Sequence, residues 1–389
     1  MMCAVSAKMN NKNISVAIIE KNDRVGKKLL ATGNGRCNLT NKNASADSFV
    51  GSFAMQSRYI FTKYPTETLL NKFESLGLLS CCDKEGRYYP LCKQASAVLD
   101  VLRFTCERLN VDIFCKENIH SLKKSKDIFS IKTDNNNFSC KKLVLACGSK
   151  ASPKLGGNGS VGDYLMNFGH SFYPFSPALC PVKVKSDLLK FLKGIRSGCC
   201  ATLSDSNGKI IKKENGEVQF TENALSGICI FNLSLYTKKG MYILLDLIPD
   251  IEKNALYNIL LAQKERFANQ SIDNIFTGIF QKRISQAILK MGGITYFSKT
   301  VNQLTNENLE SLCKIAKAMR FEVIENSGFD NAQCTKGGVK GKEINEKTME
   351  SKKIKGLYIC GEAIDICGEC GGYNLHFAFS TGDLAGENL

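Results

Sequence analysis

Residues 24–38 hold the densest group of side chains able to bind a phosphorylated ligand. The cationic members, which could pair with a pyrophosphate, are Arg24, Lys27, Lys28 and Arg36. The polar members, which could form hydrogen bonds, are Thr32, Asn34 and Asn38. Glycines at 26, 33 and 35 permit unusual backbone angles and the close approach of a ligand. Composition alone is equally consistent with a basic surface loop.

The strand expected just before this segment ends in an acid. Residues 14–20 form a short apolar run that closes on Glu20. In a Rossmann-type unit, the acid after the second strand binds the ribose hydroxyls, and the glycine-rich phosphate loop lies roughly 20 residues earlier. Counting back from Glu20 reaches Met1. Either this is a different kind of unit, or the chain begins inside the first helix of a dinucleotide-binding unit, after its first strand and GxGxxG loop.

Periodicity outlines the elements that must position these residues. It predicts helices at 66–79 and 96–109 and strands at 111–115, 128–132 and 142–147. Beyond the prolines at 174, 177 and 181, it predicts short strands at 198–203, 209–213, 217–221 and 241–247, helices within 251–318, and a strand at 321–325. This order predicts an α/β protein with a Rossmann-like domain split in sequence. The inserted part is an antiparallel β-barrel or sandwich with a helical subdomain. The predicted domains are 1–176, 177–335 and 336–389.

Composition restricts the class of protein. The chain has 389 residues, 43% of them apolar, as in ordinary globular proteins. It has no apolar run of the roughly 18 residues that a membrane span needs, so we expect a soluble, cytoplasmic protein. The net charge of +15 either attracts polyanions such as RNA or serves solubility, depending on how it is distributed.

The 18 cysteines are expected to be reduced, and many of them lie inside apolar runs. Cys367 and Cys370 have CxxC spacing, but His376 is the only further ligand nearby. Zinc needs four ligands, so no metal site is expected.

The run KKLLATGNGRCNLTN, residues 27–41, resembles a signature of the BaiN/YhiN-type NAD(P)/FAD-dependent oxidoreductases, the aminoacetone-oxidase-like flavoproteins. Further segments resemble the same family's motifs in the same order. They are residues 216–221 with 225–227, then 335–339, 348–352, 356–362 and 371–375. The resemblance covers nearly the whole chain, and several linked motifs are far more specific than one glycine loop.

This resemblance implies FAD as the cofactor. Glu20 would bind the adenosine ribose, and the segment 371–375 would begin a helix whose amides face the flavin. The implied cofactor-binding residues are Glu20, Lys21, Arg24, Lys28, Thr32, Gly33, Asn34, Gly35, Arg36, Cys37, Asn38, Ala146, Gly148, Gly361, Glu362, Asp365, Gly371, Gly372, Tyr373, Asn374 and Leu375. Because the first glycine loop is missing, we expect FAD to bind weakly or not at all, and we favour a misplaced start codon as the reason.

The resemblance also implies an oxidoreductase that uses NAD(P)H. There is no second glycine loop, so the nicotinamide would dock transiently at the flavin. Cys37 is a candidate proton donor or redox thiol, although such a residue is more often simply packed. The substrate is either a uridine of ribosomal RNA, reduced to dihydrouridine, or a small enone or amine metabolite. A third reading is a non-catalytic RNA-binding remnant that has lost FAD.

Overall fold

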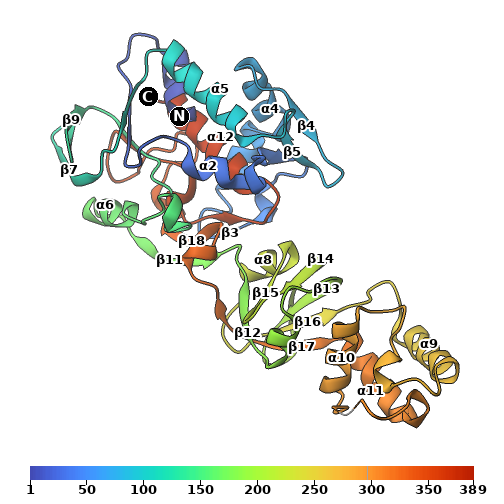
Figure 1. Cartoon of the computed structure of the whole chain (residues 1–389). Helices are drawn as coiled ribbons and strands as arrows, with labels where there is room; N and C mark the ends of the chain where they lie inside the picture. The colour runs from blue at the N-terminus through green and yellow to red at the C-terminus, as the bar shows by residue number, and fades with distance from the viewer. Residues whose placement is uncertain (296) are drawn as a thin grey trace. The chain divides into compact units, whose positions relative to one another are not determined.

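The computed structural model describes residues 1–295 and 297–389, which form two compact units. Unit 1 comprises Met1–Ala178 and Phe329–Leu389, so it is assembled from both ends of the chain (Figure 1). Unit 2 is the intervening segment, Leu179–Gly328. Each unit has its own apolar core.

Unit 1 is built around helix α12 (Tyr373–Glu387), which packs against α1 (Met2–Asn10). Ten of the 15 residues of α12 are buried, so this helix has no solvent-facing side along most of its length. Small residues let the two helices approach closely. A Cβ atom at Gly386 would lie 2.4 Å from the carbonyl oxygen of Cys3 and 2.6 Å from the Cβ atom of Ser6.

Parallel strand pairs place the glycine-rich segments of unit 1. Strand β1 (Ala17–Glu20) pairs with β6 (Asp112–Cys115), and β10 (Leu143–Leu145) pairs with β19 (Leu357–Ile359). Helix α5 (Ala95–Arg108) precedes β6, as expected from its apolar periodicity. Parallel strands need long crossover connections, and β10 and β19 are joined by a connection that includes all of unit 2.

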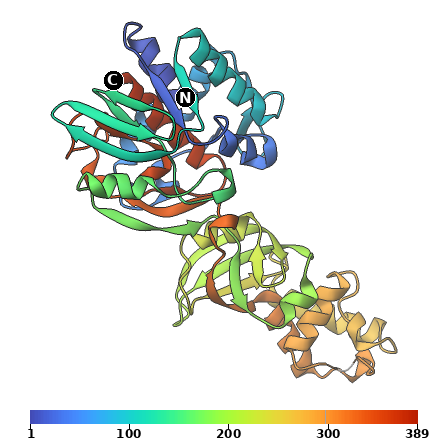
Figure 2. The ribbon, with the colours of Figure 1, turned by 60° about the vertical axis from the view of Figure 1, so that its left-hand side comes forward.

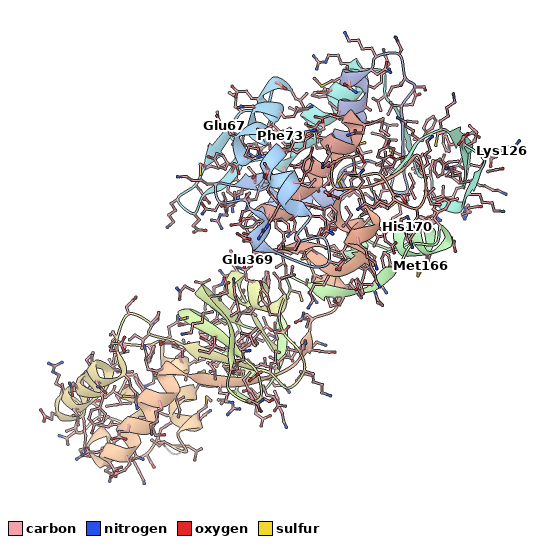
Figure 3. All side chains as sticks on the ribbon, turned by 180° about the vertical axis from the view of Figure 1, so that it is seen from behind. Glu67, Phe73, Lys126, Met166, His170 and Glu369 are labelled. Atoms are coloured by element: carbon pink, nitrogen blue, oxygen red, sulfur yellow. The ribbon has the colours of Figure 1, made fainter. Side chains whose placement is uncertain are left out.

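The remaining elements of unit 1 surround this centre. The helices are α2 (Lys27–Ala31), α3 (Ser57–Lys63), α4 (Thr66–Ser75) and α6 (Val161–Asn167). The antiparallel pairings join β2 (Thr40–Asn41), β5 (Arg87–Pro90) and β4 (Ser80–Cys82); β3 (Phe49–Val50) and β20 (Cys367–Gly368); and β11 (Phe172–Ala178) and β18 (Cys334–Val339). A meander of β7 (Ile119–Ser125), β8 (Ile128–Thr133) and β9 (Asn137–Cys140) carries Lys126 at one tip (Figure 3).

The buried His170 forms hydrogen bonds that connect its own loop to the segments that contain Glu343 and Ser351. His170 Nδ1 lies 2.9 Å from Glu343 Oε2, and Ser351 Oγ lies 2.9 Å from His170 Nε2. Burial opposes ionisation of the Glu343 carboxyl, but hydrogen bonds from Ser171, Lys353 and His170 outweigh it and lower its pKa to about 2. Figure 3 shows His170 beside α6, inside the unit.

Unit 2 contains a closed barrel of six strands in the order β12-β15-β14-β13-β16-β17. Their bounds are β12 (Val182–Lys185), β13 (Arg196–Ser204), β14 (Ile210–Phe220), β15 (Ala224–Ser226), β16 (Tyr242–Asp246) and β17 (Met319–Asn326). Alternate side chains point into the core, as the period of a strand requires. The two strands expected at 209–213 and 217–221 are one strand, β14. That prediction was wrong because Asn215 and Gly216 stay in the ladder opposite Cys200 and Cys199.

Helices complete unit 2. Helices α7 (Leu188–Leu192) and α8 (Ile228–Ser234) connect barrel strands, whereas α9 (Lys253–Arg266), α10 (Lys282–Met291) and α11 (Asn306–Lys317) form an insertion between β16 and β17. In Figures 1 and 2 this insertion, yellow to orange, groups at one end of the barrel. The predicted barrel with a helical subdomain is confirmed. Among the described residues, no helix is both long and apolar enough to span a bilayer.

The contact between α1 and α12 gives a test of the fold. The substitution Gly386→Ala should lower the free energy of unfolding by about 1–3 kcal/mol, because its Cβ atom would overlap the backbone of α1. The matched control is Gly382→Ala in the same helix, where the nearest atom would be 3.6 Å away. The control should be neutral or stabilising by up to about 1 kcal/mol. Urea unfolding of both variants measures the difference, and equal midpoints would contradict this packing.

Candidate functional site

Predicted site residues lie at the carboxyl ends of strands from the two parallel pairs of unit 1. Glu20 ends β1, Ala146 and Gly148 follow β10, and Gly361 follows β19. Cys147 interacts electrostatically with Glu20 and with Lys21, so the ends of β1 and β10 lie near each other. In open α/β sheets, ligands bind at this edge. The strands therefore bring together segments that are far apart in the sequence.

A charged cluster forms where α2 meets these strand ends. Lys28 Nζ lies 2.6 Å from Glu362 Oε2, and both side chains are partly buried. Ser149 Oγ donates a hydrogen bond to the same carboxylate oxygen over 3.1 Å. Gly148 has φ +72°, and a Cβ atom there would lie 3.9 Å from Glu362 Oε2. Sequence reasoning missed Ser149, although it directly follows the strand-end glycine.

The start of α12 lies against the signature segment 38–41. Gly371 and Gly372 have φ of +135° and +99°, a backbone region that glycine adopts readily. A Cβ atom at Gly372 would lie 2.7 Å from both Asn38 Oδ1 and the carbonyl oxygen of Thr40. Asn41 Nδ2 donates to the carbonyl oxygen of Gly371 over 3.1 Å. Two predicted site segments, 330 residues apart, are thus in direct contact.

His376, in the first turns of α12, is fully buried and fixes the helix to that segment. Its Nε2 lies 2.8 Å from the carbonyl oxygen of Tyr64, and its Nδ1 lies 2.6 Å from Thr40 Oγ1. A carbonyl oxygen only accepts, so Nε2 donates and Nδ1 accepts from the threonine hydroxyl. Burial lowers the pKa of His376 to about 4. The sequence singled out this residue only as a metal ligand. Within residues 1–295 and 297–389, the structure shows no cluster of metal-ligating side chains.

Two of the predicted acids have different surroundings. Glu20 is partly exposed, and its Oε1 accepts hydrogen bonds from the backbone and side-chain nitrogens of Asn22, each over 2.8 Å. Asp365 is buried, and its carboxylate accepts from the backbone N–H groups of Ser52 and Gly337 over 2.8 and 3.0 Å. Asp365 therefore joins two loops beneath the site, whereas Glu20 stays open to a ligand.

Cys37 is fully buried in an apolar cluster with Leu39. Burial raises the pKa of its thiol to about 11, so it is protonated near neutral pH. A buried, protonated thiol is a poor nucleophile, so this environment favours the packing role over the redox-thiol role considered for this residue.

The rest of the segment 24–38 is more open. Arg36 lies over the ring of Tyr89, 4.8 Å from its centroid. The exposed predicted residues are Arg24, Asn34, Gly35 and Arg36, and those of intermediate exposure are Lys21, Lys28, Thr32 and Gly33.

The turn before α12 is held by its own side chains. Asn374 accepts from the backbone N–H of Gly368 over 2.8 Å and donates to its carbonyl oxygen over 2.9 Å. Tyr373 and Leu375 are partly buried at the helix start. The thiol of Cys367 hydrogen-bonds that of Cys334, a contact between β20 and β18 that the CxxC spacing to Cys370 did not indicate.

Comparison with known proteins agrees with this geometry. The profile described as HI0933-like protein Rossmann domain matches residues 1–388. The 3-dehydro-bile acid delta(4,6)-reductase of Clostridium scindens is 33% identical over 99% of this chain and 95% of that protein. The ribosomal RNA dihydrouridine synthases of Escherichia coli and Haemophilus influenzae are 27% and 23% identical, over 96% and 94% of this chain and 92% and 90% of theirs. The predicted family, the Rossmann-like fold class and the oxidoreductase class are confirmed.

The buried His376 predicts a pH-dependent stability. Its folded pKa of about 4 lies below the roughly 6.5 of an unfolded histidine, so protons bind the unfolded chain more tightly. The contribution to stability is complete above pH 6.5 and is lost as the pH falls towards 4, by about 3 kcal/mol at most. Urea unfolding at several pH values should show a shallower pH slope for His376→Gln. His120→Gln, at an exposed histidine, is the control and should keep the wild-type slope. An unchanged slope in His376→Gln would contradict this assignment.

Proposed function

The chain belongs to the HI0933-like Rossmann family, and on that premise we propose that it is an FAD-dependent reductase of carbon–carbon double bonds conjugated to a carbonyl group. The observation that supports this most directly is the gathering of Lys28, Ser149 and Glu362 at the carboxyl ends of parallel strands. A strand-end cluster of this kind is where α/β proteins bind dinucleotides.

The residues of unit 1 fit FAD. Glu20 is partly exposed at the end of β1, where an acid binds ribose hydroxyls. Gly148 has a positive φ and leaves room beside Glu362 for a close approach. Asn38 Oδ1 is buried and has no hydrogen-bond partner within the described part of the chain, so it is available to a bound group.

The chain's own groups would bind and orient the cofactor. Helix α12 begins at Tyr373, and its first N–H groups and dipole favour negative charge at that end. His376 is neutral there, so it adds no charge of its own to this helix end. Lys28 would bind the pyrophosphate, and its ion pair with Glu362 would keep the lysine in place. Bound FAD would supply the hydride to the double bond, with NAD(P)H as the proposed source of electrons.

For the substrate we propose a uridine of ribosomal RNA. Two relatives are named for dihydrouridine synthesis, and the net charge of +15 favours binding to a polyanion. A small enone is the second candidate, because the 33% identical relative is named for reduction of a 3-dehydro-bile acid. The uracil ring and a dienone share a double bond conjugated to a carbonyl, so one site chemistry serves both.

Lys28 provides a test of cofactor binding. Lys28→Gln should weaken FAD binding about tenfold or more, because Glu362 would then be an unpaired negative charge near the pyrophosphate. Lys27→Gln is the matched control. That lysine pairs with the exposed Asp23, an arrangement worth little, so FAD affinity should stay near wild type. Titration followed by flavin fluorescence measures both affinities. Equal losses in the two variants would contradict the assignment of Lys28.

The substrate class can be tested with the FAD-loaded protein. With NAD(P)H present, ribosomal RNA transcripts should gain dihydrouridine, and this activity should fall steeply as salt rises. A neutral cyclic enone serves as the control, because its reduction should be nearly independent of salt. Enone reduction without any dihydrouridine would support the second candidate. Failure to bind FAD or to reduce either substrate would contradict the flavoenzyme proposal.

A further inference from the structure

Two cysteine side chains meet where strands β13 and β14 of unit 2 lie against α8. Cys199 lies on β13 directly opposite Gly216 of β14. A Cβ atom at Gly216 would lie only 3.2 Å from the Cβ atom of Cys229 and 3.7 Å from its sulfur. Directly opposite residues have Cβ atoms about 4.5–5.5 Å apart, so Cys229 fills the space facing Cys199 that a side chain at 216 would take. The two thiols share a hydrogen bond, and both residues are buried.

The two thiols are not equivalent. The hydrogen bond from Cys199 lowers the pKa of Cys229, and the backbone N–H groups of Cys229 and Ile230 at the start of α8 act in the same direction against burial. The same bond, together with burial, raises the pKa of Cys199. Of the two, Cys229 is therefore the thiol that loses its proton more readily. The thiolate is the nucleophilic form of cysteine.

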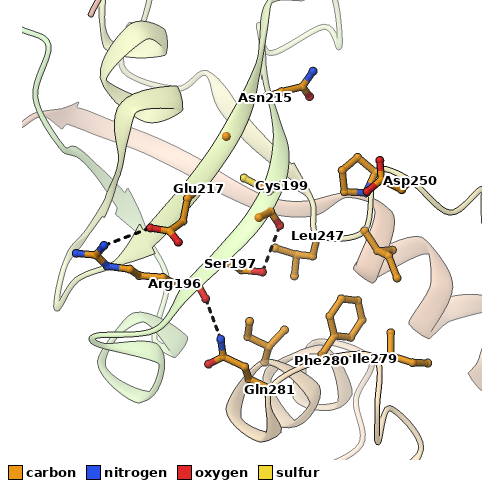
Figure 4. A pocket seen from close by; sticks show the side chains of 15 residues that line it. Arg196, Ser197, Cys199, Asn215, Glu217, Leu247, Asp250, Ile279, Phe280 and Gln281 are labelled. Atoms are coloured by element: carbon orange, nitrogen blue, oxygen red, sulfur yellow. Dashed lines mark hydrogen bonds and ion pairs between the residues drawn. The ribbon is translucent and has the colours of Figure 1, made fainter. Parts of the chain in front are cut away.

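A pocket in unit 2 reaches this pair. It has a volume of about 870 Å³, and Cys199, Gly216 and Glu217 form part of its wall (Figure 4). The opposite side is formed by residues 247–250 and 279–281. The Cys229 sulfur lies 3.5 Å from the carbonyl oxygen of Glu217, directly behind that wall. Cys199 is part of the pocket wall, and Cys229 lies behind that wall against Gly216.

We propose that Cys199 and Cys229 are an oxidation site, a thiol pair that closes to a disulfide when a small peroxide enters this pocket. The Cys229 thiolate attacks one peroxide oxygen, the O–O bond breaks, and the departing hydroxide takes up a proton to give water. Once Cys229 is a sulfenic acid, its thiolate no longer opposes ionisation of Cys199; the Cys199 sulfur attacks the Cys229 sulfur, the S–O bond breaks, and the departing hydroxide takes the Cys199 proton and leaves as a second water. The two thiols lose two electrons, and one hydrogen peroxide becomes two waters. The new bond ties β13 to α8 beside the pocket.

The wild-type protein provides the first test, independently of any cofactor. The full chain is treated with hydrogen peroxide, its free thiols are blocked, and its peptides are mapped by mass spectrometry. A peptide pair joined through Cys199 and Cys229 is expected to appear first. Cys313 of α11 is the control. It is equally buried in unit 2, but burial raises its pKa to about 11, so it should stay reduced. Absence of the cross-link, or oxidation of Cys313 at the same rate, would overturn the proposal.

Single substitutions test the two roles. In Cys199→Ser, the sulfenic acid at Cys229 has no partner and should be trapped by dimedone. In Cys229→Ser, Cys199 should give no dimedone adduct, because burial by itself still raises the pKa of its thiol. An adduct at Cys199, or none at Cys229, would overturn the assignment of the attacking thiol. The wild-type cross-link keeps the proposal testable if either variant folds poorly. Failure of the flavin proposal would leave all of these results unchanged.

Discussion

Unit 1 depends on the close packing of helix α12, against the segment 38–40 at its first turn and against α1 near its C-terminal end. Gly372 has to be glycine because a side chain there would meet the backbone of Thr40, and Gly386 lies directly on α1. His376 adds hydrogen bonds to Thr40 and to the backbone at Tyr64. A buried helix satisfies its own backbone groups except at its ends, so the N-terminal turn is where a polar partner is most useful. The same turn is where the proposed flavin would lie.

Fewer of the cations in residues 24–36 are placed to bind an anionic ligand than the sequence suggests. Of the four cations between residues 24 and 36, Lys28 pairs with a partly buried acid, Lys27 pairs with an exposed one, and Arg36 lies over an aromatic ring. Exposed ion pairs contribute roughly 0–1 kcal/mol, whereas partly buried charges are screened less. Lys28 is therefore the cation whose loss should matter most to an anionic ligand.

The buried cysteines of the two units differ in their pKa because their surroundings differ. Burial raises the pKa of several cysteines, including Cys37, Cys313 and Cys360, which then behave as small apolar side chains. Cys229 is equally buried, but a donated hydrogen bond and the backbone amides of α8 stabilise its thiolate. Hydrogen bonding to the charged form outweighs desolvation at this position. The neighbouring pocket then decides which solutes can reach the pair.

The order of motifs and the hydrophobic periods were enough to predict the family, the split Rossmann-like domain and the inserted barrel with helices, because these depend on local patterns that survive in a single chain. The break expected within β14 was wrong because Gly216 looks like a turn residue locally, whereas the pairing with Cys199 keeps it in the ladder. The sequence singled out Lys28, Gly148, Glu362 and Gly372, but nothing in their spacing placed Lys28 on Glu362 or Gly372 on Thr40. Ser149, the neutral state of His376 and the contact between Cys199 and Cys229 were decided only by tertiary structure. Each depends on partners between 30 and 336 residues away, and on burial, which no local pattern records.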